Sequence, residues 1–556
     1  MNNRIKQSGL DANLPAESPL REYLAQKAET GRAPAVEKAP LLLPLRPAMD
    51  RWPQTLLIMP PITLSEGTVK RVIPPLGLSY IAAYLESQGI PCDILDCVVE
   101  GLDNEELVGD RTWRYGLSDA DLRARLTELA PEIVGISIIY SSDLPNLYTV
   151  ARIAKEVNPD VTVVVGGIHP SIYPEEVLRE LLIDGKPTVD FIVRGEGELR
   201  MAEFIRNFRQ GTFDFHADGL AGWYKGAIFK NPQIATIQDL DALPFPAYHK
   251  LPLEKYFEFN VPFSPFPRGK RVMQLYSSRG CPVSCTFCAS TNFNKAYRAR
   301  SVENIIAEIH HYKQRYDIDE IQFADDNLTF DRGRAREFFT ALKQCQLPWC
   351  TPNGIMVNTL SEELLDLMIE SGLYQLTLSL DSGNAKTLKE KHRKPVDLTR
   401  VPDLMEYLKQ RNILMHGTLV VGMPGETVED IEEGFRFVTE LPFNSIGVFI
   451  AQALPGSELY EVSLARGAIS RMGARTIDTA RSGITLSHIS SEQLEQMTAD
   501  FLFRYNQIIK ERDTEAWERK YNHHRERLSR ICIGRSAPNT AGIIRAAQPT
   551  PQEIVR

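Results

Sequence analysis

Three cysteines stand close together near the middle of the chain. Cys281, Cys285 and Cys288 follow the spacing C-x3-C-x2-C, so one short loop must carry all of them. Thiolate is the usual protein ligand of a [4Fe–4S] cluster, and three thiolates leave the fourth iron open for chemistry. The alternative is a zinc site, which needs a fourth Cys or His, and His310 is the next candidate along the chain. The pattern favours the cluster.

The cysteine loop follows the first strand of a repeated strand–helix pattern. Short apolar runs predict strands at Val272–Tyr276, Glu320–Phe323, Cys350–Met356, Gln375–Ser379, Leu414–Val421 and Ser445–Ile450. Amphipathic stretches predict helices between them, at Val302–Arg315, Arg334–Gln344, Glu362–Ser371, Asp403–Lys409 and Val428–Glu440. This alternation predicts a partial (β/α)6 barrel, whose chemistry lies at the carboxyl ends of its strands. The three cysteines stand at such an end.

A second strand–helix series precedes this barrel. Its predicted strands are Thr55–Met59, Cys92–Leu95, Ile133–Ile138, Val161–Val165 and Asp190–Val193. Its predicted helices are Leu78–Ser87, Asp119–Leu129, Leu147–Val157 and Pro174–Leu182. The series predicts an α/β domain with a doubly wound parallel sheet, which binds ligands at the carboxyl ends of its strands.

The cysteine spacing and the barrel pattern, over about residues 271–460, resemble the radical S-adenosylmethionine (SAM) enzymes. In that family SAM chelates the open iron. The resemblance implies SAM contacts from the cysteine motif and from the ends of the second and fourth strands, at Phe287, Asp325, Asp326, Asn327, Ser379 and Asp381. Asp381 stands where many relatives carry Glu, and Asp and Asn are also common in N-caps and Asx turns. The family-like turns at 421–427 and 453–457 are expected to be mainly structural.

The N-terminal series, over about residues 53–199, resembles the cobalamin-binding domains that precede such barrels. The resemblance is carried by the segments 74–82, 134–137, 165–170 and 194–198. It implies cobalamin contacts from strand ends and their loops, at Pro75, Leu76, Gly77, Ser137, Gly166, Gly167, His169, Gly195 and Glu196. A flavodoxin-like nucleotide-binding domain is the alternative for this half alone.

A cobalt-ligating motif, D-x-H-x-x-G, occurs at Asp214–Gly219. A ligating histidine should follow the first strand, at Pro60–Thr63, whereas His216 follows the fifth. We interpret the match as accidental and expect cobalamin without a histidine on its lower face. His169 is placed to contact the nucleotide tail, although a loop histidine is commonly just solvated.

We expect six segments along the chain. They are a mobile arm (1–50), a cobalamin-binding domain (51–212), a connector with a hairpin near 222–230 (213–265), the barrel (266–460), a helical region (461–533) and a disordered tail (534–556). The stretch 491–527 predicts one or two charged helices with an apolar stripe formed by Leu494, Met497, Phe501, Tyr505 and Ile508.

Composition limits the partners and the compartment. A net charge of −9 without a basic stripe argues against nucleic acid as a partner. The sequence contains no apolar run long enough to span a bilayer and no signal-peptide core. Eight cysteines in 556 residues do not form a disulfide framework, so we expect a cytoplasmic enzyme. Buried hydrophobic positions are the expected role of Cys345, Cys350 and Cys532.

The combined resemblance implies a cobalamin-dependent radical SAM methyltransferase with a small-molecule substrate. In this class cobalamin takes a methyl group from one SAM, the reduced cluster cleaves another, and the methyl reaches an unactivated carbon or a P–H group. An electron donor such as flavodoxin or ferredoxin is also implied. Residues 74–137 locally resemble the methylases of phosphonates and phosphinates, including that of the fosfomycin pathway.

Three alternatives differ in chemistry. The first is a non-methylating cobalamin-dependent radical SAM enzyme that performs a cyclisation or ring rearrangement. The second is a non-enzymatic cobalamin or Fe–S sensor, which six strand–helix units disfavour. A methylthiotransferase is also disfavoured, because only Cys92 and Cys97 lie in the N-terminal half, where a second cysteine trio would be needed.

Overall fold

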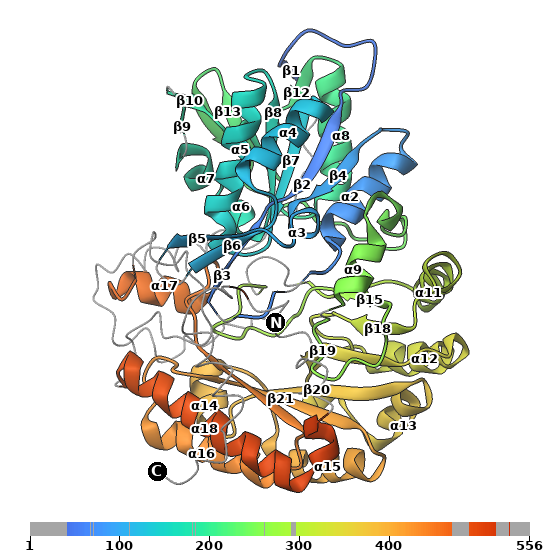
Figure 1. Cartoon of the computed structure of the whole chain (residues 1–556), viewed down its shortest axis with the longest axis vertical. Coiled ribbons are helices and arrows are strands. Elements are labelled where there is room, and N and C mark those ends of the chain that lie inside the picture. Colours follow the sequence, from blue (N-terminus) through green and yellow to red (C-terminus); the bar gives the residue numbers. More distant parts are fainter. Residues whose placement is uncertain are drawn as a thin grey trace, which may run out of the picture.

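The computed structural model describes residues 42–518, apart from 67, 71, 110, 111, 181, 184, 261, 291–295 and 470–488, together with residue 533. The expectations for residues 1–41, for the tail from 534 and for Cys532 lie outside the described residues. The described chain forms two α/β bodies, an N-terminal one and a larger C-terminal one (Figure 1).

The N-terminal body is built on a seven-stranded sheet. Its strands, in spatial order, are β14 (Ala227–Lys230), β13 (Leu220–Tyr224), β11 (Phe191–Val193), β8 (Thr162–Gly167), β7 (Ile133–Ile138), β2 (Thr55–Met59) and β4 (Asp93–Asp96). The five strands from β11 to β4 are parallel and are the five predicted from the sequence. The predicted hairpin is β13–β14, which pairs antiparallel with β11 and so extends this sheet.

Helices cover both faces of the sheet, as a doubly wound fold requires. One face packs against α2 (Leu76–Ser87) and α8 (Gly197–Arg209), and the other against α4 (Asp119–Leu129), α5 (Leu144–Val157) and α7 (Pro174–Glu180). The sequence analysis did not assign α8. Short elements complete the body: β1 (Leu42–Pro44), α3 (Cys97–Glu100), α6 (Ile168–Ile172), β9 (Leu182–Ile183), β10 (Lys186–Pro187) and β12 (Thr212–Asp214).

A small antiparallel sheet, absent from the predictions, lies on the side of the N-terminal body that faces the barrel (Figure 1). It consists of β3 (Ile62–Ser65), β6 (Thr112–Tyr115) and β5 (Glu105–Gly109), in that order. Tyr115 of β6 is buried and shares a hydrophobic cluster with barrel residues, as do Val98 and Val99 of α3. The two bodies are therefore packed together by apolar contacts.

The C-terminal body is a six-stranded parallel sheet in sequential order, an open (β/α)6 barrel. Its strands are β15 (Val272–Leu275), β18 (Glu320–Phe323), β19 (Trp349–Ile355), β20 (Leu373–Asp381), β21 (Leu414–Val421) and β22 (Ser445–Ile450). Its outer helices are α11 (Val302–Tyr316), α12 (Arg332–Leu342), α13 (Glu362–Glu370), α15 (Val401–Gln410) and α16 (Val428–Glu440). Shorter helices are α9 (Leu253–Phe259), α14 (Ala385–Thr387) and α17 (Glu458–Ala465). The fold class predicted from the sequence is confirmed.

The C-terminal helix α18 (Ser491–Arg512) packs against the barrel. Its Phe501 stacks on Phe435 of α16 with ring centroids 4.0 Å apart. Leu494, Phe501 and Tyr505 are buried as predicted, but the last buried residue of the stripe is Ile509 rather than Ile508. The spacing of four from Tyr505 keeps Ile509 on the face set by Phe501.

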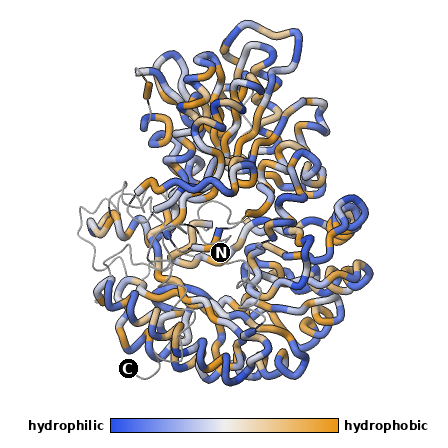
Figure 2. Tube along the Cα trace, viewed as in Figure 1, coloured by the Kyte–Doolittle hydropathy of each residue, from blue (hydrophilic) through white to orange (hydrophobic). Residues whose placement is uncertain are grey.

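The hydrophobic segments follow the strands of both sheets (Figure 2). No helix in the part of the chain that the structure describes has the length and apolar character needed to cross a membrane. In both bodies the parallel strands place their carboxyl ends at one edge, and ligand sites belong there.

Candidate active site

The cysteine loop begins directly after β15. Strands β16 (Ser278–Arg279) and β17 (Arg298–Ala299) pair at its base, so the loop leaves and returns at neighbouring positions. Cys281, Cys285 and Cys288 are half-buried free thiols. Burial raises the pKa of Cys281, and it raises that of Cys285 to about 12. These two side chains are therefore protonated at neutral pH unless a metal binds them.

Two buried residues beside the loop carry polar atoms without a hydrogen-bond partner within the described chain. Asn327 donates from Nδ2 toward Met356 Sδ (3.2 Å) and lies 3.9 Å from Cys281 Sγ, while its Oδ1 accepts no hydrogen bond. His392 is fully buried with neither ring nitrogen hydrogen-bonded, and its ring meets Phe287 edge to face. Burial lowers the pKa of His392 to about 4, so its ring is neutral and keeps one N–H donor. Buried groups of this kind fit a loop that encloses a further polar group.

The described residues contain no group of three or more His, Cys, Asp or Glu side chains that could hold a single metal ion. A zinc site would require such a group, whereas each thiolate on a [4Fe–4S] cluster binds a different iron. Three thiols on one loop, with the polar atoms of Asn327 and His392 beside it, fit a [4Fe–4S] cluster.

The three polar residues after β18 have different surroundings. Asp325 is buried and accepts hydrogen bonds from Ser277 N (3.1 Å), Ser277 Oγ (2.7 Å) and Ser278 Oγ (2.5 Å). Burial raises its pKa. Asp325 thus holds the segment that leads into the cysteine loop, while Asp326 is exposed and accepts from Gly280 N.

The end of β20 is irregular where two predicted SAM contacts lie. The register with β21 shifts between Ser379 and Asp381, and Asp381 has a φ of +61°. Asp381 is buried and paired with Lys394 Nζ at 2.5 Å. Ser379 Oγ occupies the space beside Gly354, where a Cβ would lie 2.0 Å from it.

A cavity of about 780 Å³ lies against the cysteine loop. It is lined by Pro282, Val283 and Ser284 of the loop and by Phe330, Leu388 and Lys394, among others. Its volume is that of a small-molecule site, and Lys394 links its wall to Asp381.

The predicted cobalamin residues gather at the carboxyl edge of the first sheet. Ser137 pairs with Gly166 and Ile138 with Gly167 across β7 and β8. Gly167 has a φ of +111°, and a Cβ there would lie 1.8 Å from the carbonyl oxygen of Ile138. By contrast, a Cβ on Gly77 would meet no atom within 4 Å, which leaves open space beside the start of α2, where Pro75 and Leu76 also lie.

His169 is buried rather than solvated. It lies in α6, directly after β8, and its Nδ1 is 2.9 Å from Ser141 Oγ. Its ring also contacts Tyr173, whose hydroxyl donates to Glu461 and accepts from Gly456 N. His169 thus lies in a chain of contacts that reaches α17 of the second body.

The segment after β11 carries a network that the sequence analysis missed. Glu196 accepts from both terminal nitrogens of Arg298 (2.7 and 2.9 Å) and lies 3.1 Å from Arg279. Glu198, which was not singled out, pairs with Arg279 at 2.7 Å. Arg279 is distant from Glu198 in sequence, so no local pattern indicated this ion pair. Gly195 bridges Ala235 and has a φ of +93°.

His216 lies in the turn between β12 and β13, and this turn ends at Gly219, whose carbonyl accepts from Arg194 N directly after β11. The backbone N–H of His216 donates to Asp214 Oδ1 at 2.9 Å, and this hydrogen bond forms an Asx turn. The turn reaches the carboxyl end of β11, and the interpretation of D-x-H-x-x-G as accidental stays a prediction. Cys345 and Cys350 are fully buried in the barrel, as expected of hydrophobic positions.

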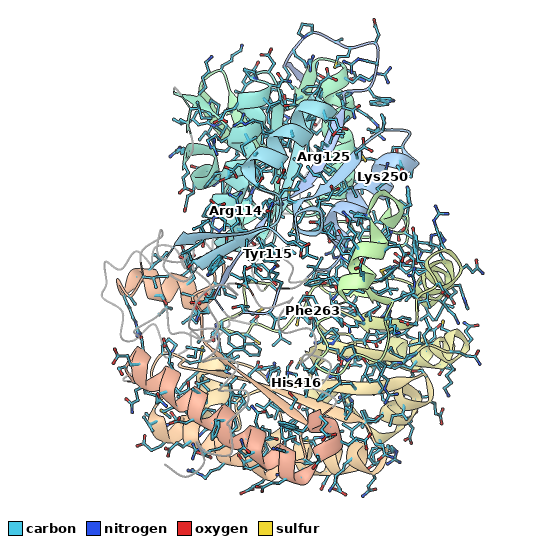
Figure 3. The ribbon with its side chains drawn as sticks, in the orientation of Figure 1. Arg114, Tyr115, Arg125, Lys250, Phe263 and His416 are labelled. Atoms are coloured by element: carbon cyan, nitrogen blue, oxygen red, sulfur yellow. The ribbon has the colours of Figure 1, made fainter. Side chains whose placement is uncertain are left out.

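Figure 3 labels Tyr115 and Phe263 between the two bodies and His416 in the barrel. Along β21, half-buried His416, Thr418 and Val420 alternate with buried neighbours. In a barrel strand such alternation separates the face covered by helices from the inner face. His416 therefore belongs to the less covered face.

A doubly wound sheet whose carboxyl edge meets a barrel with a three-cysteine loop defines the class of radical SAM enzymes with a cobalamin-binding domain. Residues 65–205 match the B12 binding domain, and residues 275–438 match the Radical SAM superfamily. The chain is 36% identical over 453 residues to cytidylyl-2-hydroxyethylphosphonate methyltransferase of Streptomyces wedmorensis, covering 76% of this chain and 84% of that protein. The chain belongs to the cobalamin-dependent radical SAM methyltransferases, and its cofactors are cobalamin, SAM and a [4Fe–4S] cluster.

Other relatives and solved structures agree with this assignment. An uncharacterized methyltransferase of Pyrococcus horikoshii is 31% identical over 447 residues, 80% of this chain and 90% of that protein. The radical SAM methyltransferase TsrM of Kitasatospora setae has a TM-score of 0.59 at 16% identity, covering 75% of this chain and 77% of that one. The cobalamin-dependent enzyme OxsB has a TM-score of 0.62 at 14% identity, covering 89% and 75%. These two structures share the fold.

Proposed function

We propose that this enzyme methylates an unactivated carbon of a small organophosphonate that carries a cytidylyl-type nucleotide group. The observation that carries the proposal is the 36% identity over 453 residues to a methyltransferase for cytidylyl-2-hydroxyethylphosphonate. The less covered face of β21, with His416 and Thr418, supplies polar groups on the inner side of the barrel. We assign the substrate to the region between this face and the carboxyl edge of the first sheet.

Each cofactor has a set of residues to hold it. Cys281, Cys285 and Cys288 hold the cluster, and Asn327 and His392 are the buried polar groups placed to hydrogen-bond it or its thiolates. When bound, the cofactors supply one-electron cleavage of SAM and transfer of a methyl group.

The predicted SAM contacts differ in whether other protein groups already bind their side chains. Phe287, Asp326, Asn327 and Ser379 face SAM, while Asp325 acts by holding the start of the cysteine loop. Asp381 reaches SAM together with Lys394, because Lys394 lines the cavity and pairs with Asp381. A buried carboxylate with one cationic partner keeps further acceptor capacity for a ribose hydroxyl.

Cobalamin is held at the carboxyl edge of the first sheet. Pro75, Leu76 and Gly77 border the open space at the start of α2, and Ser137, Gly166 and Gly167 allow close approach of the ring or its tail. His169 and Gly195 shape the same edge. Glu196 is occupied by two arginines, so its part is to hold the edge in place.

The reductant and the compartment are also proposals. The described cysteines, Cys92, Cys97, Cys281, Cys285, Cys288, Cys345 and Cys350, are all free thiols. This supports a reducing cytoplasm, where a flavodoxin- or ferredoxin-type protein donates the electron.

A non-methylating reaction is the second candidate. The supporting observation is 30% identity over 384 residues to the anaerobic magnesium-protoporphyrin IX monomethyl ester cyclase of Rubrivivax gelatinosus, covering 66% of this chain and 62% of that protein. The products distinguish the two candidates, because methylation produces S-adenosylhomocysteine and the alternative does not.

The test is anaerobic reconstitution with iron, sulfide and hydroxocobalamin, followed by reduction with SAM and cytidylyl-2-hydroxyethylphosphonate. Formation of deoxyadenosine, S-adenosylhomocysteine and a methylated phosphonate supports the proposal, and Cys281→Ala should abolish deoxyadenosine formation. Deoxyadenosine without S-adenosylhomocysteine favours the second candidate. Both nucleoside products without a methylated phosphonate refute the substrate assignment alone.

A further inference from the structure

The cysteine loop is closed at its base by a pair of arginines. Arg279 of β16 and Arg298 of β17 are direct cross-strand partners. Arg279 stands two residues before Cys281, and Arg298 stands where the chain returns. Whatever holds these two residues therefore holds both ends of the loop.

Both arginines bind carboxylates of the other body. Arg279 lies 2.7 Å from Glu198 and 3.1 Å from Glu196, and Arg298 grips Glu196 with two hydrogen bonds of 2.7 and 2.9 Å. The four side chains are largely buried, with exposed fractions of 18% for Arg279 and 10% or less for the others. Arg279 also lies over the ring of Tyr80, 5.1 Å from its centroid. Arginine–carboxylate pairs with two parallel hydrogen bonds fix the relative orientation of the two groups as well as bringing opposite charges together.

The same segment is bound to α6, the short helix that follows β8. Gly195 N donates to Ser171 Oγ at 2.9 Å, and Ser171 Oγ donates to the carbonyl of Gly167 at 2.6 Å. One continuous set of hydrogen bonds thus runs from the glycines at the cobalamin edge to the base of the cysteine loop.

A buried ion pair is weak grounds for a stability role, because desolvation offsets much of its attraction. Its geometry is the more informative property here. Two carboxylates two residues apart at the start of α8 meet two arginines that close a single loop. Tyr256 of α9 also donates to Asp96 of the first body (2.6 Å), so the network is one of several contacts between the bodies.

We propose that Glu196 and Glu198 are positioning residues that fix the cysteine loop against the cobalamin-binding domain, and so set the placement of the cluster relative to cobalamin. The proposal rests on the assignment of Cys281, Cys285 and Cys288 to the cluster. It predicts that loosening the network separates SAM cleavage from methyl transfer without emptying either cofactor site.

The test uses Glu196→Gln, Glu198→Gln and the double variant in the full chain. The matched control is Asp190→Asn, which breaks a pair with Lys155 (2.7 Å) inside the first body. Amide hydrogen exchange is measured on cofactor-free protein at residues 278–281 and 298–300. We expect at least tenfold faster exchange there in the double variant and no change in the control.

The second readout uses enzyme that has been reconstituted with the cluster and cobalamin. With iron and cobalamin contents unchanged, the double variant should form several-fold more deoxyadenosine per methylated product. The magnetic coupling between cob(II)alamin and the reduced cluster should also weaken. Unchanged exchange, or unchanged coupling with an unchanged product ratio, overturns the proposal.

Two further variants address misfolding and the underlying assignment. If the double variant does not fold, Arg279→Lys keeps the charge and loses the fork, and the same partial loosening is expected; wild-type exchange in that variant also overturns the proposal. The exchange result on cofactor-free protein is independent of the cysteines. Retention of the cluster by Cys281→Ala therefore refutes the ligand assignment separately.

Discussion

Two glycines at the cobalamin edge of the first sheet are expected to respond in opposite ways to the same substitution. Gly167→Ala places a Cβ 1.8 Å from the carbonyl oxygen of Ile138, in a backbone conformation with a φ of +111°. The left-handed region costs an L-residue about 1–2 kcal/mol, and overpacking adds about 1–3 kcal/mol. We expect the free energy of unfolding of the first body to fall by roughly 2–5 kcal/mol.

Gly77→Ala meets no protein atom within 4 Å and lies in α2, where alanine stabilises a helix by about 1 kcal/mol relative to glycine. The cofactor-free protein should therefore be as stable as the wild type or slightly more so. If cobalamin fills the open space beside Gly77, the added methyl group competes with it, and cobalamin retention should fall at least tenfold.

The assay is thermal unfolding of cofactor-free protein, together with cobalamin content by absorbance after gel filtration. An unfolding midpoint of Gly167→Ala equal to that of the wild type would refute the strain argument. Full cobalamin retention by Gly77→Ala would remove Gly77 from the binding site. The two results are independent, because one concerns stability and the other binding.

Three further predictions concern the cysteine loop, the pair of Asp381 and Lys394, and Asp143, which lies between β7 and α5 of the first body. Cys281→Ala should reduce bound iron after reconstitution to background, while Cys345→Ala, a control in the buried core, should bind iron like the wild type; equal iron in both variants contradicts the ligand assignment. Lys394→Met leaves Asp381 buried without its cation, so SAM affinity measured by equilibrium dialysis should fall at least tenfold, and unchanged affinity excludes the pair from the SAM site. Burial raises the pKa of Asp143 to about 7, so between about pH 4 and 7 the folded protein keeps a proton that the unfolded chain releases, and stability falls as pH rises through this window. Asp143→Asn should flatten that slope in urea unfolding measured at several pH values, and an unchanged slope contradicts the assignment.

Local signals account for the elements that the sequence predicted well. The strand 133–138 matches β7 because Ile133, Val134 and Ile136 form an apolar run that the sheet buries on both faces. Helices α4 and α16 begin where predicted because Ser118 and Thr427 cap their N-termini, the latter in a capping box with Asp430.

Elements that depend on distant partners were missed. The strand β6 reads Thr-Trp-Arg-Tyr, mixed in character, and its pairing with β3 joins Tyr115 to Ile62. Hydrophobic periodicity does not reveal such strand pairings, because each strand alone is short and half polar. The helix α8 was missed for a different reason: its first turn contains Gly197 and Glu198 and resembles a loop.

The residues of the candidate site fall into the same two groups, those with a local sequence signal and those that depend on distant partners. Three cysteines on one loop are a local pattern, so the sequence predicts the cluster ligands without any knowledge of the fold. Lys394 pairs with Asp381, thirteen positions away, and Arg279 pairs with Glu198, eighty-one positions away. No spacing rule links the members of either pair. The resemblance assigned Asp325 to SAM, which stays a prediction, and the contacts of Asp325 with Ser277 and Ser278 could not be read from the sequence.

Topology explains why residues so far apart in sequence meet at one place. Each body is a parallel sheet, so each collects its loops of functional residues at one carboxyl edge. Residues after β8 and β11 therefore lie together in the first body, and those after β15, β18 and β20 in the second. Glu198 then pairs with Arg279 across the boundary, which joins the two edges. Chemistry that needs a methyl carrier and a radical generator at one substrate requires such a junction, and a change at this pair should alter the coupling of the two half-reactions more than either one alone.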